Sequence, residues 1–128
     1  MADFRLAASA EAQLVDILDY SAATFGDGAR ERYAILLVQA MQDVAETPDK
    51  PTVNWKQTPV GRVGIYHVRH SRQRVPIPPG QVLEPRHFLV FQVGKDNIVD
   101  ILGFIHDRML FNRALNRIAR SGGNDPET

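Results

Sequence analysis

The chain of 128 residues contains no cysteine. Disulfides, cysteine-ligated zinc sites and thiol nucleophiles are therefore excluded. A helix needs about 20 apolar residues to cross a bilayer, and no apolar run in the sequence is that long. The first residues also lack the apolar core of a signal peptide. We therefore expect a cytoplasmic protein that does not associate with a membrane.

Net charge is also absent, since 15 Lys and Arg balance 15 Asp and Glu. The charges are nevertheless segregated: residues 1–49 carry nine acidic and three basic side chains, whereas residues 50–83 carry six basic and no acidic ones. The basic segment is either a solvated strip or a patch for an acidic partner or nucleic acid. The length and the 44% hydrophobic content predict one domain over 1–120, and the polar residues 121–128 predict a disordered tail.

Two helices are predicted in the first half of the chain. The first covers about 10–24, with Ser9 as its N-cap, and Gly26 ends it. The second has apolar residues at helical spacing and must stop near Thr47, because Pro48 follows. A short break separates the two helices, so they form an antiparallel hairpin.

The rest of the chain favours β-structure. We expect a short opening strand at about 3–8 and another strand at about 62–69. The proline-rich segment 71–86 is predicted to be a loop. Two apolar runs, 87–93 and 98–105, flank a Gly/Asp/Asn turn and predict a β-hairpin.

The hairpin strands are apolar at almost every position, so both of their faces should be covered. The helical hairpin would cover one face. A short C-terminal helix that starts near Asp107, a partner chain, or both would cover the other. The fold class is therefore α+β, with a strand and a helical hairpin packed on a small antiparallel sheet.

Few candidate catalytic groups remain. His67 and His70 would point to opposite faces of a strand, so a shared metal ion is not expected. The sequence also lacks a serine nucleophile elbow and a phosphate-binding glycine loop. One chemistry stays open, namely acid–base cleavage of RNA by these two histidines with His106 and Arg108.

Six segments in order along the chain resemble the RelE/ParE superfamily of toxins, and most closely its ParE branch, often described as plasmid stabilisation proteins. They are Phe4-Arg5-Leu6 leading to Ala12, Ile17–Tyr20 with Phe25-Gly26, Ala29 with Tyr33, Val63–His70, Pro85–Phe91 and Ile101–Met109. The resemblance spans about Phe4 to Ile118 and implies a RelE/ParE-like fold.

The resemblance implies the toxin of a type II toxin–antitoxin module. ParE-type toxins inhibit DNA gyrase and are neutralised by a ParD-type antitoxin, whereas RelE-type toxins cleave messenger RNA on the ribosome. No tyrosine follows Tyr66 and lysine is scarce, which favours gyrase inhibition over RNA cleavage. An inactive relative that only binds its antitoxin is a third possibility. The expected protein is not an enzyme, has no cofactor, meets DNA only through antitoxin or gyrase, and forms a hetero-oligomer with its antitoxin.

Two sets of binding residues are predicted in the framework of this resemblance. The residues expected to bind the target lie at the junction before the C-terminal helix and on that helix: His106, Arg108, Met109, Arg113 and Arg117. The residues expected to bind the antitoxin lie on the helical hairpin and in the basic segment: Leu14, Tyr33, Leu37, Arg62, Arg69 and Arg72. No residue is assigned a catalytic or metal-binding role.

Overall fold

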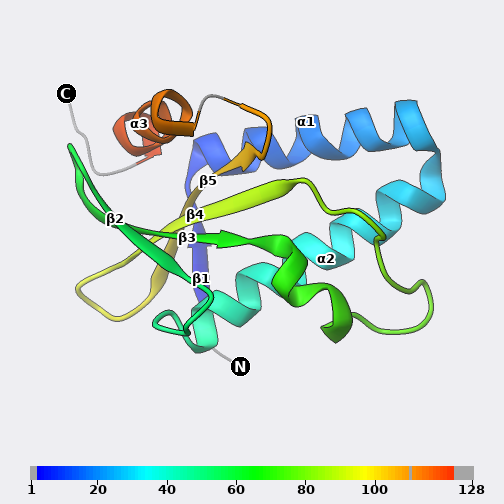
Figure 1. Cartoon of the computed structure of the whole chain (residues 1–128), viewed down its shortest axis with the longest axis horizontal. Coiled ribbons are helices and arrows are strands. Elements are labelled where there is room, and N and C mark those ends of the chain that lie inside the picture. The colour runs from blue at the N-terminus through cyan, green and yellow to red at the C-terminus, as the bar shows by residue number, and fades with distance from the viewer. Residues whose placement is uncertain (1–2, 110, 123–128) are drawn as a thin grey trace.

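A computed structural model describes residues 3–109 and 111–122. It contains a five-stranded sheet with the strand order β1-β5-β4-β3-β2 (Figure 1). The strands are β1 (Phe4–Leu6), β2 (Asn54–Thr58), β3 (Gly61–His67), β4 (His87–Val93) and β5 (Val99–His106). The predicted α+β class is confirmed with one difference: β1 pairs with β5 in parallel, so the sheet is mixed.

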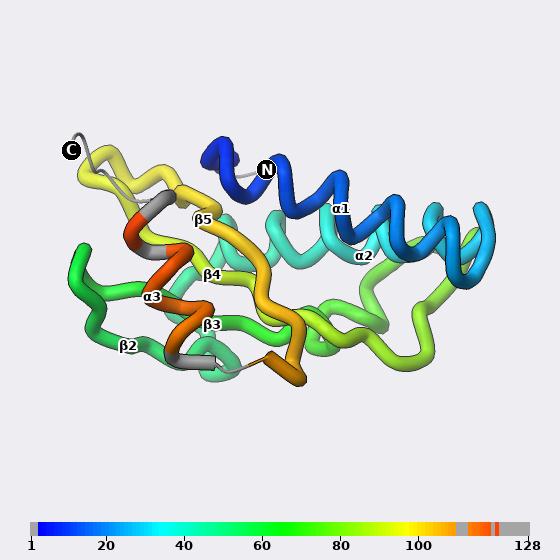
Figure 2. The backbone as a smooth tube through the Cα atoms, turned by 90° about the horizontal axis from the view of Figure 1, so that it is seen from above, coloured from blue at the N-terminus to red at the C-terminus, as the bar shows by residue number. Residues whose placement is uncertain are grey.

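Two helices, α1 (Ala8–Phe25) and α2 (Asp27–Glu46), form the expected hairpin and lie side by side (Figure 2). Only Gly26 separates them, with φ at 94°, a backbone conformation that favours glycine. The apolar side of α2 is buried against the sheet, as its periodicity predicted. The prediction for Ser9 is wrong, because the N-cap is Ala7 and makes no side-chain capping bond.

Ser9 instead donates a hydrogen bond to the backbone of β5 at a β-bulge. Val90 pairs with Gly103 but the next residue of β4 pairs with Ile101, so one residue of β5 is left over. Ser9 Oγ donates to the carbonyl of that residue, Leu102, at 3.0 Å, and Gln13 Oε1 accepts from Phe104 N at 2.7 Å. One turn of α1 thus supplies hydrogen-bond partners to two backbone groups of β5 at and beside the bulge.

The segment after β3 differs from the sequence prediction. The strand expected to reach residue 69 ends at His67, and a 3₁₀ helix, η1 (Val68–Arg74), occupies the start of the predicted loop. Asp43 of α2, which is 3% exposed, holds η1 in place. Its carboxylate accepts from Ser71 Oγ at 2.6 Å and from Arg74 Nε at 2.9 Å.

The opposite face of the sheet is covered by α3 (Phe111–Gly122). Ala114, Leu115 and Ile118 are buried there against apolar residues of β3, β4 and β5. The helix begins later than predicted, because a turn in which Met109 N donates to His106 O comes first. It also extends into the predicted tail, of which residues 123–128 lie outside the described residues. None of the described helices is long and apolar enough to span a membrane.

Candidate functional site

The candidate site lies at one end of the sheet, where three strands meet. β3 and β5 both run antiparallel to β4, so their carboxyl ends and the amino end of β4 share this end (Figure 1). His67, His87 and His106 occupy these strand ends, and His87 pairs with His106 in the sheet register. His67, which the sequence pairs with His70 as a candidate, contacts Phe88 of β4 and Asp107 after β5.

The same local turn follows β3 and β5. His67 Nδ1 accepts a hydrogen bond from Arg69 N, and His106 Nδ1 accepts one from Arg108 N, both at 3.1 Å. A neutral imidazole that accepts at Nδ1 carries its proton at Nε2, so both rings are assigned the Nε2–H form. Each His-x-Arg turn therefore places an exposed arginine just beyond the end of its strand.

Asp107 links these turns to β4. Its Oδ2 lies 3.3 Å from His67 Nε2 and its Oδ1 lies 3.1 Å from a terminal nitrogen of Arg86. Its backbone N–H donates to the Arg86 carbonyl at 2.8 Å. Asp107 thus fixes the first residue after β5 to the residue before β4. Oδ1 makes no well-directed hydrogen bond within the described part of the chain, so its contact with Arg86 is electrostatic.

Tyr33 and His87 form a polar pair beneath α2. Arg86 N donates to the Tyr33 hydroxyl oxygen at 3.0 Å, which leaves the hydroxyl proton for His87 Nδ1, 2.6 Å away. Burial, and to a smaller extent the neighbouring His106, lowers the pKa of His87 to about 4. Burial also raises the pKa of Tyr33 to about 12. Both groups are neutral at pH 7, which suits a structural contact.

His67 is also held in an uncharged state. Its side chain is 4% exposed, and burial lowers its pKa although the hydrogen bond to Asp107 opposes the shift. His106 is more accessible, with 39% of its side chain exposed. No cluster of three or more His, Asp or Glu suited to a metal ion occurs among the described residues. The chemistry that remains available is the binding of anions by arginine and imidazole N–H groups.

The predicted target-binding residues all reach the surface. His106 is partly exposed, whereas Arg108, Met109, Arg113 and Arg117 are exposed. They follow one another from the end of β5 along the outward side of α3. Because Ala114, Leu115 and Ile118 face the sheet, the two arginines of α3 face away from it.

The predicted antitoxin-binding residues do not form one surface. Leu37 is fully buried in the core and Tyr33 is 8% exposed, so both belong to the packing of α2 on the sheet. This corrects the prediction that they meet a partner, because an apolar periodicity alone does not distinguish a core face from a binding face. Leu14 is half-buried against the same core.

The three predicted arginines of the basic segment are also separated. Arg62 lies near the start of β3, with its guanidinium 4.3 Å from the centre of the Trp55 ring. Arg69 and Arg72 lie beyond the other end of the strand, and Arg72 donates to the Leu83 carbonyl at 2.8 Å. At about 3.3 Å a residue, β3 separates the two groups by about 20 Å.

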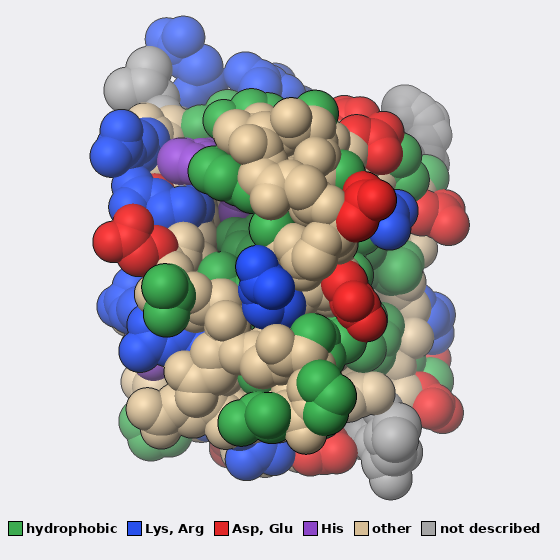
Figure 3. All heavy atoms as spheres, turned by 90° about the vertical axis from the view of Figure 1, so that its right-hand side faces the viewer, with side chains coloured by type: hydrophobic (Ala, Val, Ile, Leu, Met, Phe, Trp, Pro, Cys, Tyr) green, Lys and Arg blue, Asp and Glu red, His purple; other side chains and the backbone are tan. Residues whose placement is uncertain are grey.

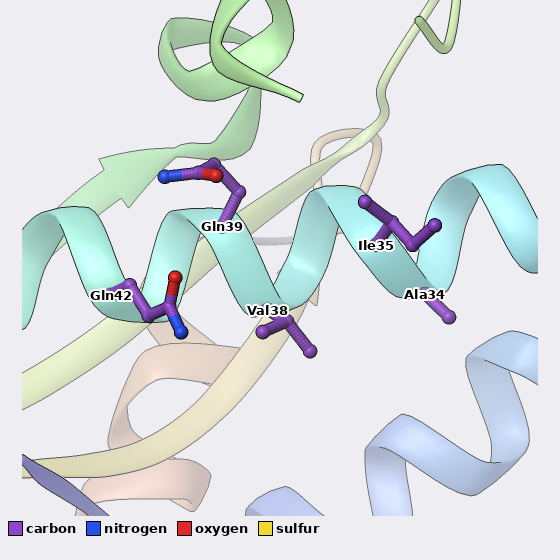
Figure 4. Close-up of a pocket in the computed structure, with 5 residues that line it drawn as sticks. All are labelled: Ala34, Ile35, Val38, Gln39 and Gln42. Atoms are coloured by element: carbon purple, nitrogen blue, oxygen red, sulfur yellow. The ribbon is translucent and has the colours of Figure 1, made fainter. Parts of the chain in front are cut away.

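The helical hairpin presents other apolar side chains to solvent. Val15 of α1 and Val38 of α2 are 54% and 45% exposed. A shallow hollow runs along α2 and is lined by Ala34, Ile35, Val38, Gln39 and Gln42. In Figure 4, Ala34 and Val38 lie on one side of the helix and Gln39 on the other. The structure thus offers a different apolar surface from the one predicted.

Comparison with known families agrees with this architecture. The family model described as ParE toxin of type II toxin–antitoxin system, parDE, matches residues 4–111, from β1 to the start of α3. No curated protein matches the chain in a sequence comparison. The protein is thus of the class of type II toxins with a RelE/ParE-like α+β fold. Within that class, the chain belongs to the ParE toxin family.

Proposed function

We propose that this ParE-family chain inhibits DNA gyrase in the cytoplasm and is neutralised by a ParD-like antitoxin in a hetero-oligomer. Family membership over residues 4–111 supports a toxin. The choice of α3 as the target-binding surface rests on its two sides: its apolar residues pack on the sheet, while Arg113 and Arg117 are exposed. Exposed arginines beside an exposed Met109 are typical of protein interfaces.

A non-catalytic mode of action fits the histidine end of the sheet. General acid–base catalysis needs groups that reach the substrate with a suitable pKa. His67 is almost fully buried, and His87 is bonded to Tyr33 with a pKa of about 4. Of the three histidines considered for RNA cleavage, only His70 and His106 are accessible, so RNA cleavage has less support than binding.

The test is expression without antitoxin in a bacterial host. We expect growth arrest with the wild-type chain and relief with Arg113→Glu/Arg117→Glu, because charge reversal removes the contact with the target. Antitoxin binding by the purified double variant should be unchanged. The matched control is Lys95→Glu, an exposed charge reversal in the β4–β5 turn, which should remain toxic.

Three outcomes contradict the proposal. Continued growth with the wild-type chain would indicate an inactive relative that only binds antitoxin. Loss of both toxicity and antitoxin binding in the double variant would mean that α3 supports the fold and does not contact the target. Cleaved messages on translating ribosomes would indicate an RNA-cleaving toxin instead.

For the antitoxin, we propose an amphipathic helix on the outer side of the helical hairpin. The hollow along α2 offers apolar contacts around Val38. Nearby, α1 exposes Glu11, Asp16 and Asp19. Figure 3 shows the end of the molecule at the α1–α2 turn, with Lys and Arg more frequent along one side and Asp and Glu along the other. A partner helix with apolar residues flanked by Lys or Arg would complement this surface.

An extended antitoxin segment would add to the sheet at β2. This strand pairs with β3 on one side and ends the strand order, so its outer backbone groups can pair with another strand. Lys56 of β2 and Arg62 of β3 lie on neighbouring strands, which favours acidic residues in that segment.

The antitoxin surface is tested by Val38→Glu. A charge placed in the hollow should weaken antitoxin binding by about 10-fold or more, because it is desolvated when the helix docks. Val93→Glu is the matched control, since Val93 is similarly exposed at 41% but lies at the end of β4. Equal affinities of the two variants, measured by calorimetry, would exclude this surface.

A further inference from the structure

Three arginines from three different elements meet at the histidine end of the sheet. Arg69 follows β3, Arg108 follows β5, and Arg86 precedes β4, which lies between them. Neighbouring strands are about 4.8 Å apart, so the two His-x-Arg turns stand about 10 Å apart. Their backbones are fixed by the bonds from Arg69 N to His67 and from Arg108 N to His106. The backbone positions of Arg69 and Arg108 are therefore fixed by the turns themselves.

The positive charge of this end is only partly compensated. Asp107 is engaged by Arg86 and His67. Arg69 and Arg108 are exposed and form no ion pair within residues 3–109 and 111–122. Glu84 lies in the loop before β4, next to Leu83, whose carbonyl accepts a hydrogen bond from Arg72 of η1 at 2.8 Å. Unpaired guanidinium groups around a rigid strand end attract an anion.

The ligand that suits this end is a chain of phosphodiesters. An acidic peptide binds best where a strand edge or an apolar groove also engages its backbone or side chains. The histidine end offers neither, because the strands stop there and turns follow. It offers guanidinium forks, which match phosphate, and the exposed imidazole of His70 beside Arg69, a ring on which a base can stack.

We propose that the turns after β3 and β5, with Arg69, Arg86 and Arg108, bind the phosphodiester backbone of a single-stranded nucleic acid. This deepens the proposed function, because Arg108 belongs to the expected target-binding surface and would touch nucleic acid directly. The test requires no gyrase and no antitoxin, so its failure would leave gyrase inhibition intact.

The experiment measures fluorescence anisotropy of labelled 20-nucleotide single-stranded DNA, single-stranded RNA and duplex DNA with the purified full chain. We expect both single strands to bind more tightly than the duplex, with affinity falling as salt rises. Arg69→Gln/Arg108→Gln should weaken binding at least 10-fold. It should also reduce the slope of log affinity against log salt by about 1.4, or about 0.7 for each lost phosphate contact.

The control is Lys95→Gln, which removes one exposed positive charge in the turn at the opposite end of β4 and should leave the affinity unchanged. Circular dichroism melting of each variant separates a lost contact from a lost fold. Equal binding by the wild-type chain and the double variant overturns the proposal. Binding of poly-glutamate in preference to every oligonucleotide also overturns it, in favour of an acidic protein partner.

Discussion

Asp43 is the clearest case of a single residue that organises a distant segment. Its side chain is 1% exposed, and Ser71, Arg74 and Gln39 all donate to it. Ser71 is in turn 2.8 Å from the Tyr66 hydroxyl. A buried carboxylate is tolerated because these donors replace water. Nothing in the sequence pattern of α2 distinguishes Asp43 from the acids on its exposed side.

Asp43→Ala should lower the free energy of unfolding by about 3 kcal/mol, because it leaves buried donors without an acceptor. Chemical denaturation measures this loss. Asp100→Ala is the comparison, since Asp100 pairs with Arg5 at the surface, where ion pairs contribute little. Similar losses in the two variants would show that the Asp43 network does not anchor η1.

The histidines predict a pH dependence of stability. Burial lowers the pKa of His87 to about 4 and also lowers that of His67. Each ring therefore takes up a proton more readily once the chain unfolds. Their contribution to stability is complete above pH 6.5 and is lost as the pH falls toward 4.

The free energy of unfolding should fall by on the order of 1 kcal/mol per pH unit between pH 6.5 and 4.5. His87→Gln removes one of the two groups and should flatten this fall, as seen in denaturation curves at each pH. A slope unchanged by His87→Gln would mean that His87 is not held neutral in the folded chain.

At the scale of elements, the pattern of apolar residues was sufficient for the elements that are buried in the core. The stripe on α2 and the β4–β5 hairpin were placed to within a few residues. β2 was missed, because Asn54–Thr58 is largely polar and becomes a strand through its pairing with β3. The start of α3 was misplaced, because the turn at His106 depends on its side chain bonding Arg108 N.

The candidate site was only partly predictable, because it also depends on contacts between residues far apart in the sequence. His106 and Arg108 were selected from the sequence, whereas the links from Asp107 to His67 and Arg86 depend on three strand ends meeting in space. One signal was available: His-x-Arg occurs at 67–69 and at 106–108, each time at the end of an apolar run, and once more at 70–72. Two apolar strands that end in the same His-x-Arg pattern suggest equivalent turns, and the structure contains them.

The packing of α3 depends on a glycine in β5. A Cβ added to Gly103 would lie 2.7 Å from Gln13 Oε1 and 2.8 Å from Ile118 Cγ2. Gly103→Ala should therefore destabilise the fold by about 1–3 kcal/mol and loosen α3. Hydrogen exchange of the α3 amides measures the second effect.

The control for this substitution is Gly28→Ala near the start of α2. An added Cβ there meets Arg32 at 3.4 Å, an ordinary contact, so stability should be unchanged or slightly raised. Unchanged exchange of α3 in Gly103→Ala would contradict the role given to Gly103.

At the scale of the whole molecule, the sheet separates two kinds of surface. The helical hairpin covers one face and presents acids and exposed apolar residues, while α3 covers the other and presents arginines. An antitoxin on the hairpin and at β2 would leave α3 uncovered. The bound antitoxin would then keep the toxin from its target without covering Arg113 and Arg117. For this reason the double variant should lose toxicity and still bind antitoxin.

The most direct measurement is the supercoiling of relaxed plasmid by DNA gyrase with the purified chain. We expect inhibition by the wild-type chain, accumulation of cleaved plasmid, and relief when a ParD-like antitoxin that binds the chain is added. Arg113→Glu/Arg117→Glu should inhibit at least 10-fold less than Lys95→Glu. Full supercoiling at a large molar excess of a folded wild-type chain would contradict gyrase as the target.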